Sequence, residues 1–170
     1  MRKIIRNAII DDIPEIMQVF SEARQIMRKS GNAKQWAVGY PSSDVLISDI
    51  ERRGAYVVLE SSQIVGYFAF LPSPEPTYNV IYSGKWLDHD APYHVVHRIA
   101  KKNDTHGVFG CIMEFCFKLE SNIRIDTHRD NIIMQHLLNR HGFSYCGIIH
   151  LQTGDERLAY QIIWKKQHSY

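Results

Sequence analysis

A polar loop between a predicted strand and a predicted helix carries residues that can bind an anion. The loop, residues 101–106, follows the apolar strand 94–100 and precedes Gly107, where an amphipathic helix begins. The first N–H groups of a helix lack an intrahelical acceptor and bind phosphate readily. Lys101 and Lys102 add positive charge. An ordinary connection with two solvated lysines is the alternative. The loop has neither a Walker-type nor a dinucleotide-binding glycine signature, which argues against a nucleotide of those classes as its ligand.

Asn131 lies in a second polar turn, which again joins a predicted strand to a predicted helix. Strand 123–126 runs into the turn Thr127-His128-Arg129-Asp130-Asn131, and an apolar helix follows before His141-Gly142-Phe143. Asn is also a common helix N-cap, so a purely structural role for Asn131 is the alternative.

Aromatic residues are concentrated in irregular segments, one of which, 72–92, is long. Long irregular segments inside a compact domain are usually functional. Their rings can form the walls of a pocket for an amine, in part through cation–π contact, or they can form a satellite core beneath the loops. The set is Trp36, Tyr40, Tyr78, Tyr82, Trp86 and Tyr93, and all but Tyr82 are predicted to contact a substrate.

Composition excludes several classes of function. The chain has 170 residues, of which 45% are apolar and 22% charged, and its formal net charge is +2. This balance argues against a nucleic-acid or membrane partner. Asp88, His89 and Asp90 are adjacent, so their side chains diverge and no metal site is predicted. The three cysteines are expected to be free thiols in a reducing compartment, and the expected location is the cytoplasm.

The predicted elements form one domain over residues 1–170. Strands are expected at 3–8, 55–60, 63–71, 94–100, 123–126, 143–150 and 158–164, and helices after Asp11-Asp12, after Ser42, from Gly107 and from Asp130. Two strand–loop–helix–strand passes and a closing hairpin predict a mixed α/β fold. Its sheet of six to seven strands is mostly antiparallel with a parallel pair in the middle, and about four helices cover both faces. The oligomeric state stays open, a homodimer included.

Three motifs give this chain a resemblance to the GNAT (Gcn5-related N-acetyltransferase) superfamily. Asn131, the apolar helix and Gly142-Phe143 resemble the second conserved motif of that family. His97-Arg98-Ile99-Ala100, the polar loop and Gly107-Val108-Phe109-Gly110 resemble its acetyl-coenzyme A motif. Gln63-Ile64-Val65-Gly66-Tyr67 is similar to its third strand, so the resemblance covers nearly the whole chain.

The resemblance implies a binding mode for acetyl-coenzyme A as cofactor. The fourth and fifth strands splay apart, and the pantetheine arm pairs with backbone at Ile99, Ala100 and Lys101. The pyrophosphate is expected on the N–H groups of the following loop and helix start, with Lys102 beside it. The amine acceptor approaches from the opposite side, near the fourth strand and segment 72–92. The cofactor residues implied are Ile99, Ala100, Lys101, Lys102, His106, Gly107, Val108, Phe109, Gly110 and Asn131.

Two positions depart from the family pattern. In the phosphate signature only Gly107 fits, because Asp104 has the wrong charge and Phe109 stands where a small residue is usual. Gly110 can take that role if the loop is shifted by one residue. The usual general-acid Tyr, seven residues after the Asn, is Leu138 here.

His97 is the predicted general base. It lies on the fourth strand, near where many family members place a catalytic carboxylate, and imidazoles titrate close to neutral pH. A hydrogen-bonded core histidine is the alternative. The predicted function is therefore direct transfer of an acetyl group to a primary amine of a small molecule. The alternatives are a protein or peptide N-acetyltransferase, a non-catalytic acyl-coenzyme A-binding regulatory domain, and an unrelated α/β interaction module.

Overall fold

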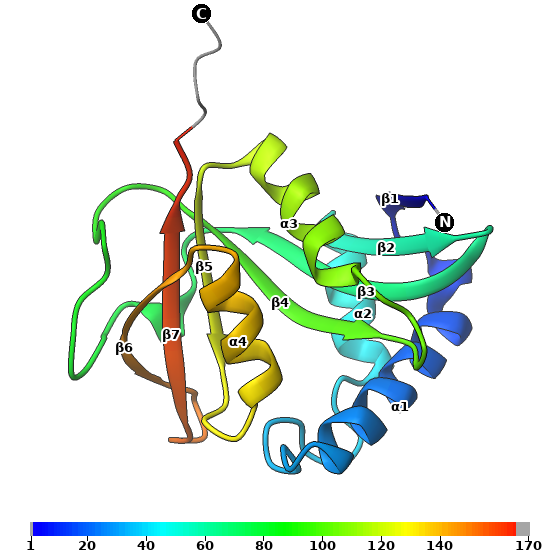
Figure 1. Ribbon diagram of the computed structural model, residues 1–170, viewed down its shortest axis with the longest axis horizontal. Coiled ribbons are helices and arrows are strands. Elements are labelled where there is room, and N and C mark those ends of the chain that lie inside the picture. Colours follow the sequence, from blue (N-terminus) through cyan, green and yellow to red (C-terminus); the bar gives the residue numbers. More distant parts are fainter. Residues whose placement is uncertain (1, 166–170) are drawn as a thin grey trace, which may run out of the picture.

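Seven strands form one sheet in the order β1-β2-β3-β4-β5-β7-β6 in the computed structural model, which describes residues 2–165 (Figure 1). Every neighbouring pair is antiparallel except β4 and β5, which are parallel. The strands are β1 (Lys3–Asn7), β2 (Ala55–Glu60), β3 (Gln63–Pro72), β4 (His94–Lys101), β5 (Asn122–Thr127), β6 (Ser144–His150) and β7 (Glu156–Ile163). The predicted fold class is confirmed.

Four helices cover the two faces of the sheet (Figure 1). Helices α1 (Ile13–Lys29) and α2 (Ser43–Glu51) pack on one face, over a cluster that includes Phe20, Leu46 and Tyr67. Helices α3 (Val108–Leu119) and α4 (Ile132–Arg140) pack on the other face, over a cluster that includes Ile112 and Leu138. Two short 3-10 turns, η1 (Ile10–Asp12) and η2 (Pro76–Tyr78), complete the regular structure of the described residues.

The closing hairpin folds back into the sheet. Strand β7 lies between β5 and β6 and pairs antiparallel with both. Because β7 is buried on this inner position, β6 becomes the edge strand. Part of segment 73–93 then covers that edge, through a bridge between Tyr82 and Ile148.

Helix α1 follows Asp11-Asp12 as predicted, but it begins without a side-chain cap. Asp12 is the N-cap residue, but its carboxylate makes no capping hydrogen bond. It accepts from Arg6 Nη1 at 2.6 Å and from the N–H of Ile9 at 2.9 Å. The hydrogen bond from Arg6 lowers the pKa of Asp12. Asp12 therefore connects β1 to the start of α1, and its negative charge pairs with Arg6.

Candidate functional site

Strands β4 and β5 separate soon after they begin. Their pairing covers only His94 with Ile123 and Val95 with Arg124. Figure 1 shows the two strands side by side at one end of the sheet and diverging toward the other. The backbone of β4 from Val96 onward therefore borders a gap in the middle of the sheet, as the family resemblance implied.

A bulge in β4 lies at this gap. The register with β3 shifts between Ala69, which pairs with His97, and Tyr67, which pairs with Ala100. Between these pairs β4 has two residues, Arg98 and Ile99, where β3 has one. Arg98 has φ +54°, a left-handed conformation that costs a non-glycine residue about 1 kcal/mol or more. The bulge therefore needs a compensating interaction.

That interaction is a buried network around Asp49 of α2. The residue Asp49 is 2% exposed. Its carboxylate accepts hydrogen bonds from Arg98 Nε at 2.8 Å and from the Tyr67 hydroxyl at 2.7 Å. Arg98 Nη1 also donates to the hydroxyl of Tyr40 at 3.3 Å. Burial opposes the charged guanidinium, but Tyr40 and Asp49 outweigh it and raise the pKa of Arg98. Arg98 is thus a structural cation that fixes the bulge.

A cavity of about 270 Å³ lies beside the bulge, and we call it the acceptor cavity. It is bounded by α1, the α1–α2 loop, the segment after β3, and strands β4, β5 and β7. Its lining residues are Met27, Gln35, Trp36, Tyr40, Glu75, Thr77, Val96, His97, Arg98, Ile99, Ile125, Asp126, Asn131, Met134, Leu151 and Arg157.

His97 faces a carboxylate inside the acceptor cavity. Its Nε2 lies 3.1 Å from Glu75 Oε2, and the side chains are 19% and 25% exposed. Glu75 is held in turn by Thr77, whose hydroxyl donates to Oε1 at 3.0 Å. The hydrogen bond from His97 is the main cause that lowers the pKa of Glu75 to about 2. Donation from Nε2–H to this carboxylate leaves Nδ1 as the ring nitrogen that can accept a proton.

A second, apolar groove of about 100 Å³ continues from the acceptor cavity, and we call it the cofactor groove. It runs between the C-terminal half of α1, the end of β4, and the first turns of α3 and α4. Four residues line both spaces, so the two meet at Met27, Ile99, Asn131 and Met134. The remaining lining residues are Ala23, Ile26, Ser30, Ala100, Lys101, Val108, Phe109, Ile133 and Leu137.

The start of α3 presents free donors next to the cofactor groove. The first hydrogen bond of the helix runs from the N–H of Cys111 to the carbonyl of Gly107. The N–H groups of Val108, Phe109 and Gly110 therefore have no intrahelical acceptor. Gly107 has φ +70°, and a Cβ built on it would meet no atom within 4 Å, so the space over this turn is open.

The predicted cofactor residues are placed in two groups. Ile99, Ala100, Lys101, Val108, Phe109 and Asn131 line the groove. The other four do not. His106 and Gly107 are exposed, the Nζ of Lys102 lies 3.9 Å from Glu15, and Gly110 borders a separate hollow beside β1. Phe109, which departs from the family pattern, is buried in the core. Its ring packs edge-on against the His141 ring, with 4.8 Å between the ring centroids.

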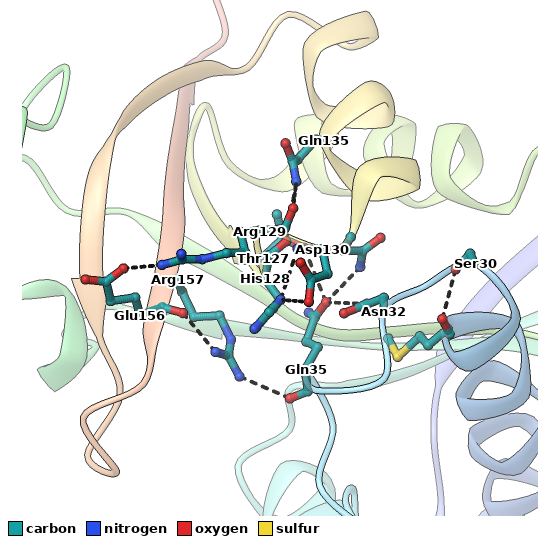
Figure 2. A network of polar contacts seen from close by, with 12 residues as sticks. Ser30, Asn32, Gln35, Thr127, His128, Arg129, Asp130, Gln135, Glu156 and Arg157 are labelled. Carbon is teal, nitrogen blue, oxygen red and sulfur yellow. Dashed lines mark hydrogen bonds and ion pairs between the residues drawn. The ribbon is translucent and has the colours of Figure 1, made fainter.

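Asn131 is the N-cap of α4, and it also lines the cofactor groove. Its Oδ1 accepts from the N–H of Met134 at 3.0 Å and caps α4. Its Nδ2 donates to Gln35 Oε1 at 2.8 Å. The same oxygen of Gln35 accepts from Asn32 at 2.9 Å, and Figure 2 shows Gln35 reaching from the α1–α2 loop into this cluster. The loop that covers the acceptor cavity is therefore fixed to the start of α4.

The predicted substrate aromatics also divide into two groups. Trp36 and Tyr40 line the acceptor cavity. Tyr78, Trp86 and Tyr93 lie instead in a third core cluster. The guanidinium carbon of Arg124 lies 4.1 Å from the centroid of the Trp86 ring and 3.8 Å from that of the Tyr93 ring. Trp86 and Tyr93 enclose this buried cation of β5, and the Tyr78 ring packs against both of them, so the structure places all three rings in the core rather than on the cavity wall.

Sequence reasoning did not single out five polar residues of the acceptor cavity: Gln35, Glu75, Thr77, Asp126 and Arg157. Glu75 stands between two prolines in an irregular segment, and Asp126 is one of the alternating polar positions of β5, after Asn122 and Arg124. Asp126 accepts from the Tyr78 hydroxyl at 2.7 Å. The alternation of Asp126 with buried Ile125 was the available signal, because it points the carboxylate away from α3 and α4.

Leu138 is fully buried in the cluster under α3 and α4, so no proton donor stands where the family usually has its Tyr.

Within residues 2–165 no group of three or more His, Cys, Asp or Glu side chains is placed to hold a metal ion. The helices of this part of the chain are all too short or too polar to span a membrane.

Comparison with solved structures gives a relative along nearly the full chain. The structure of an acetyltransferase of the GNAT family from Streptococcus agalactiae 2603 is 36% identical, with a TM-score of 0.88 over 96% of each chain. Two further structures share the fold. They are the ribosomal-protein-S18-alanine N-acetyltransferase from Escherichia coli (14% identity, TM-score 0.63, 99% of each chain) and Ard1 from Thermoplasma volcanium (13%, 0.67, 98% of this chain and 100% of that one). No family model and no curated protein matches the chain.

Proposed function

The chain belongs to the GNAT family of acetyltransferases, and we propose that it transfers an acetyl group from acetyl-coenzyme A directly to a primary amine of a small molecule. The observation that carries this proposal is the meeting of the two spaces at the gap between β4 and β5. A thioester carried along the cofactor groove reaches the acceptor cavity where both are lined by Ile99 and Asn131.

The residues of the cofactor groove fit coenzyme A. Its narrow apolar walls suit a pantetheine arm, and the β4 backbone from Val96 to Lys101, which β5 does not pair, offers amide groups to that arm. The free N–H groups of Val108, Phe109 and Gly110 suit the pyrophosphate, and the space over Gly107 leaves room for it. When bound, the group supplies an acyl thioester that is reactive toward a neutral amine.

His97 is proposed to accept the proton of the amine. Most amines are protonated at neutral pH and have no lone pair for attack, so a base increases the reactive fraction. Glu75 orients the imidazole through Nε2, and this leaves Nδ1 to act as the base. Because the carboxylate of Glu75 stays ionised, it also stabilises the imidazolium that forms.

Tyr40 is proposed to return a proton to the departing thiolate in place of the absent family Tyr. Two hydroxyl-bearing residues line the acceptor cavity, Tyr40 and Thr77, and the Thr77 hydroxyl already donates to Glu75. The Tyr40 oxygen accepts from Arg98, and its own O–H has no acceptor among the described residues. Its proton is therefore available for transfer.

A thiol-release assay with acetyl-coenzyme A and a panel of amines tests the proposal. His97→Gln should lower the rate by about 10²–10⁴-fold with little change in cofactor affinity, and high pH should partly restore it. His94→Gln is the matched control, because His94 lies on the same strand but packs against Phe70 outside both spaces. Equal rates in folded His97→Gln and wild type would refute the role of His97.

Two other functions are distinguished by the same assay. Leu138 in place of the family Tyr favours a non-catalytic acyl-coenzyme A-binding domain, which would show thermal stabilisation by coenzyme A without thiol release for any amine. A protein amine is the alternative acceptor, as the name of the Escherichia coli structure indicates for that enzyme. A peptide acetylated faster than every small amine would establish it here.

A further inference from the structure

Arg157 of β7 is a buried cation without a carboxylate partner. The residue is 5% exposed. Its Nη1 donates to the carbonyl of Glu156 at 2.9 Å and its Nη2 to the carbonyl of Gln35 at 3.1 Å. Within residues 2–165 no carboxylate oxygen lies within 4.0 Å of this guanidinium, and two of its five N–H groups have these acceptors. A buried cation in this state is costly unless a ligand neutralises it.

Two other arginines, the largely buried Arg98 and the buried Arg124, show how the protein neutralises such charges elsewhere. Arg98 is paired with Asp49, and Arg124 lies between the faces of Trp86 and Tyr93. Neither solution is present at Arg157, which lines the acceptor cavity.

The nearest acid along the chain is turned away from Arg157. The carboxylate of Glu156 pairs with Arg129 on the protein surface (Figure 2). In the same view the guanidinium of Arg157 points to the backbone of Gln35. Glu156 and Gln35 therefore each contribute a neutral carbonyl to it, and neither contributes a carboxylate. The guanidinium is thus held by two neutral carbonyls, and Arg157 lies between the acceptor cavity and a second hollow that Lys34, Asp130 and Asp155 also line.

Acidic and basic side chains of the acceptor cavity come from different segments of the chain. The acidic side consists of Glu75, next to His97 of β4, and Asp126 of β5. The basic side is Arg157 of β7, one position beyond the pairing of Thr127 with Leu158. An acceptor that carries an ammonium group and an anion matches this distribution, whereas an acceptor with only an amine leaves Arg157 unpaired.

We infer that Arg157 binds a carboxylate of the acceptor, so that the substrates are small amino acids whose amine lies toward His97. The inference rests on the proposed transferase function and deepens it. A guanidinium fork suits a carboxylate because two parallel N–H groups match its two oxygens. The cavity of about 270 Å³ also suits an acceptor of that size.

The test compares matched pairs of acids and amides as acceptors: glycine and glycinamide, β-alanine and β-alaninamide, 4-aminobutyrate and its amide. For wild type and Arg157→Gln, kcat/KM is measured for each pair, and the acid-to-amide ratio is compared between the proteins. This double ratio cancels the different basicity of the amines. For at least one pair, Arg157→Gln should lower the ratio by about 10- to 100-fold, and Arg157→Lys should restore part of it.

Arg129→Gln is the matched control, because Arg129 carries the same charge nearby but is exposed and outside the acceptor cavity. Its ratio should equal that of wild type. Melting temperatures show whether the variants fold, and the ratio within one protein does not depend on the folded fraction.

A ratio that is the same in Arg157→Gln and wild type for every pair overturns the inference while transfer itself persists. Absence of thiol release with every amine of the panel, these pairs included, would instead contradict the proposed function. Calorimetric binding of the same pairs to the coenzyme A complex needs no turnover and decides the inference in that case. Tighter binding of an acid than of its amide, lost in Arg157→Gln, supports it, and equal binding refutes it.

Discussion

Replacing Asp49 by Asn should destabilise the protein far more than its place on a short helix suggests. The change keeps the volume of the side chain but removes the charge that neutralises Arg98 and puts an N–H₂ group among donors. The carboxylate is almost fully buried and accepts from Arg98 and from Tyr67. Breaking a buried ion pair by removing one partner typically costs about 3–5 kcal/mol, because the other charge is left unpaired.

The expected change in melting temperature follows from the size of the chain. For a chain of 170 residues, 1 kcal/mol corresponds to roughly 2–4 °C, so Asp49→Asn should lower the melting temperature by roughly 6–20 °C. The measurement is thermal unfolding followed by circular dichroism at pH 7. Glu51→Gln is the control, because Glu51 lies on the same helix but is exposed, and it should change stability by no more than about 0.5 kcal/mol.

A double variant separates the ion pair from simple loss of packing. Asp49→Asn with Arg98→Gln should be more stable than Asp49→Asn alone, because no unpaired charge is left in the core. A decrease of less than about 3 °C in Asp49→Asn, or a double variant less stable than the single one, would refute the assignment of this network as the support of the β4 bulge.

Three further predictions concern the ligand sites. Coenzyme A should raise the melting temperature, and Gly107→Val should abolish that rise by filling the open space at the start of α3, whereas Gly154→Val, with a similar positive φ but far from the groove, should keep it. Asn131→Ala should weaken coenzyme A binding and lower the melting temperature by removing the α4 cap, and unchanged affinity would reduce Asn131 to a helix cap. Glu75→Gln should be less stable than wild type at pH 7. Since the pKa of Glu75 is lowered from 4.5 to about 2, this difference should be complete above pH 4.5 and disappear as the pH falls through about 2; a constant difference would contradict the pairing with His97.

The sequence by itself determined the elements and their order. Hydrophobic periods and the Asp and Ser residues at helix starts are local signals, so the starts of α1 and α2 and the strand–helix alternation of the second half were found close to their observed places. The turn before α3 and the turn at Asn131 were also predicted, because free N–H groups at a helix start follow from helix geometry alone.

Only the tertiary structure decided which polar side chains share one cavity. Glu75, Asp126 and Arg157 are far apart in the sequence, and each belongs to a different segment, so no local pattern relates them. The aromatic segment illustrates the same limit. Trp36 and Tyr40 line the acceptor cavity, whereas Trp86 and Tyr93 enclose Arg124, and nothing in their spacing distinguishes the two roles.

The physical reason lies in the separation of β4 from β5 and in the bulge at Arg98. Hydrogen-bond pairing between strands joins distant parts of the chain, and the contact of Arg98 with Asp49 joins residues 49 positions apart. These long-range contacts place His97 beside Glu75 and open the gap in which the two spaces meet. Local sequence sets how each segment folds, but the balance of buried charges between segments sets where the chemistry can occur.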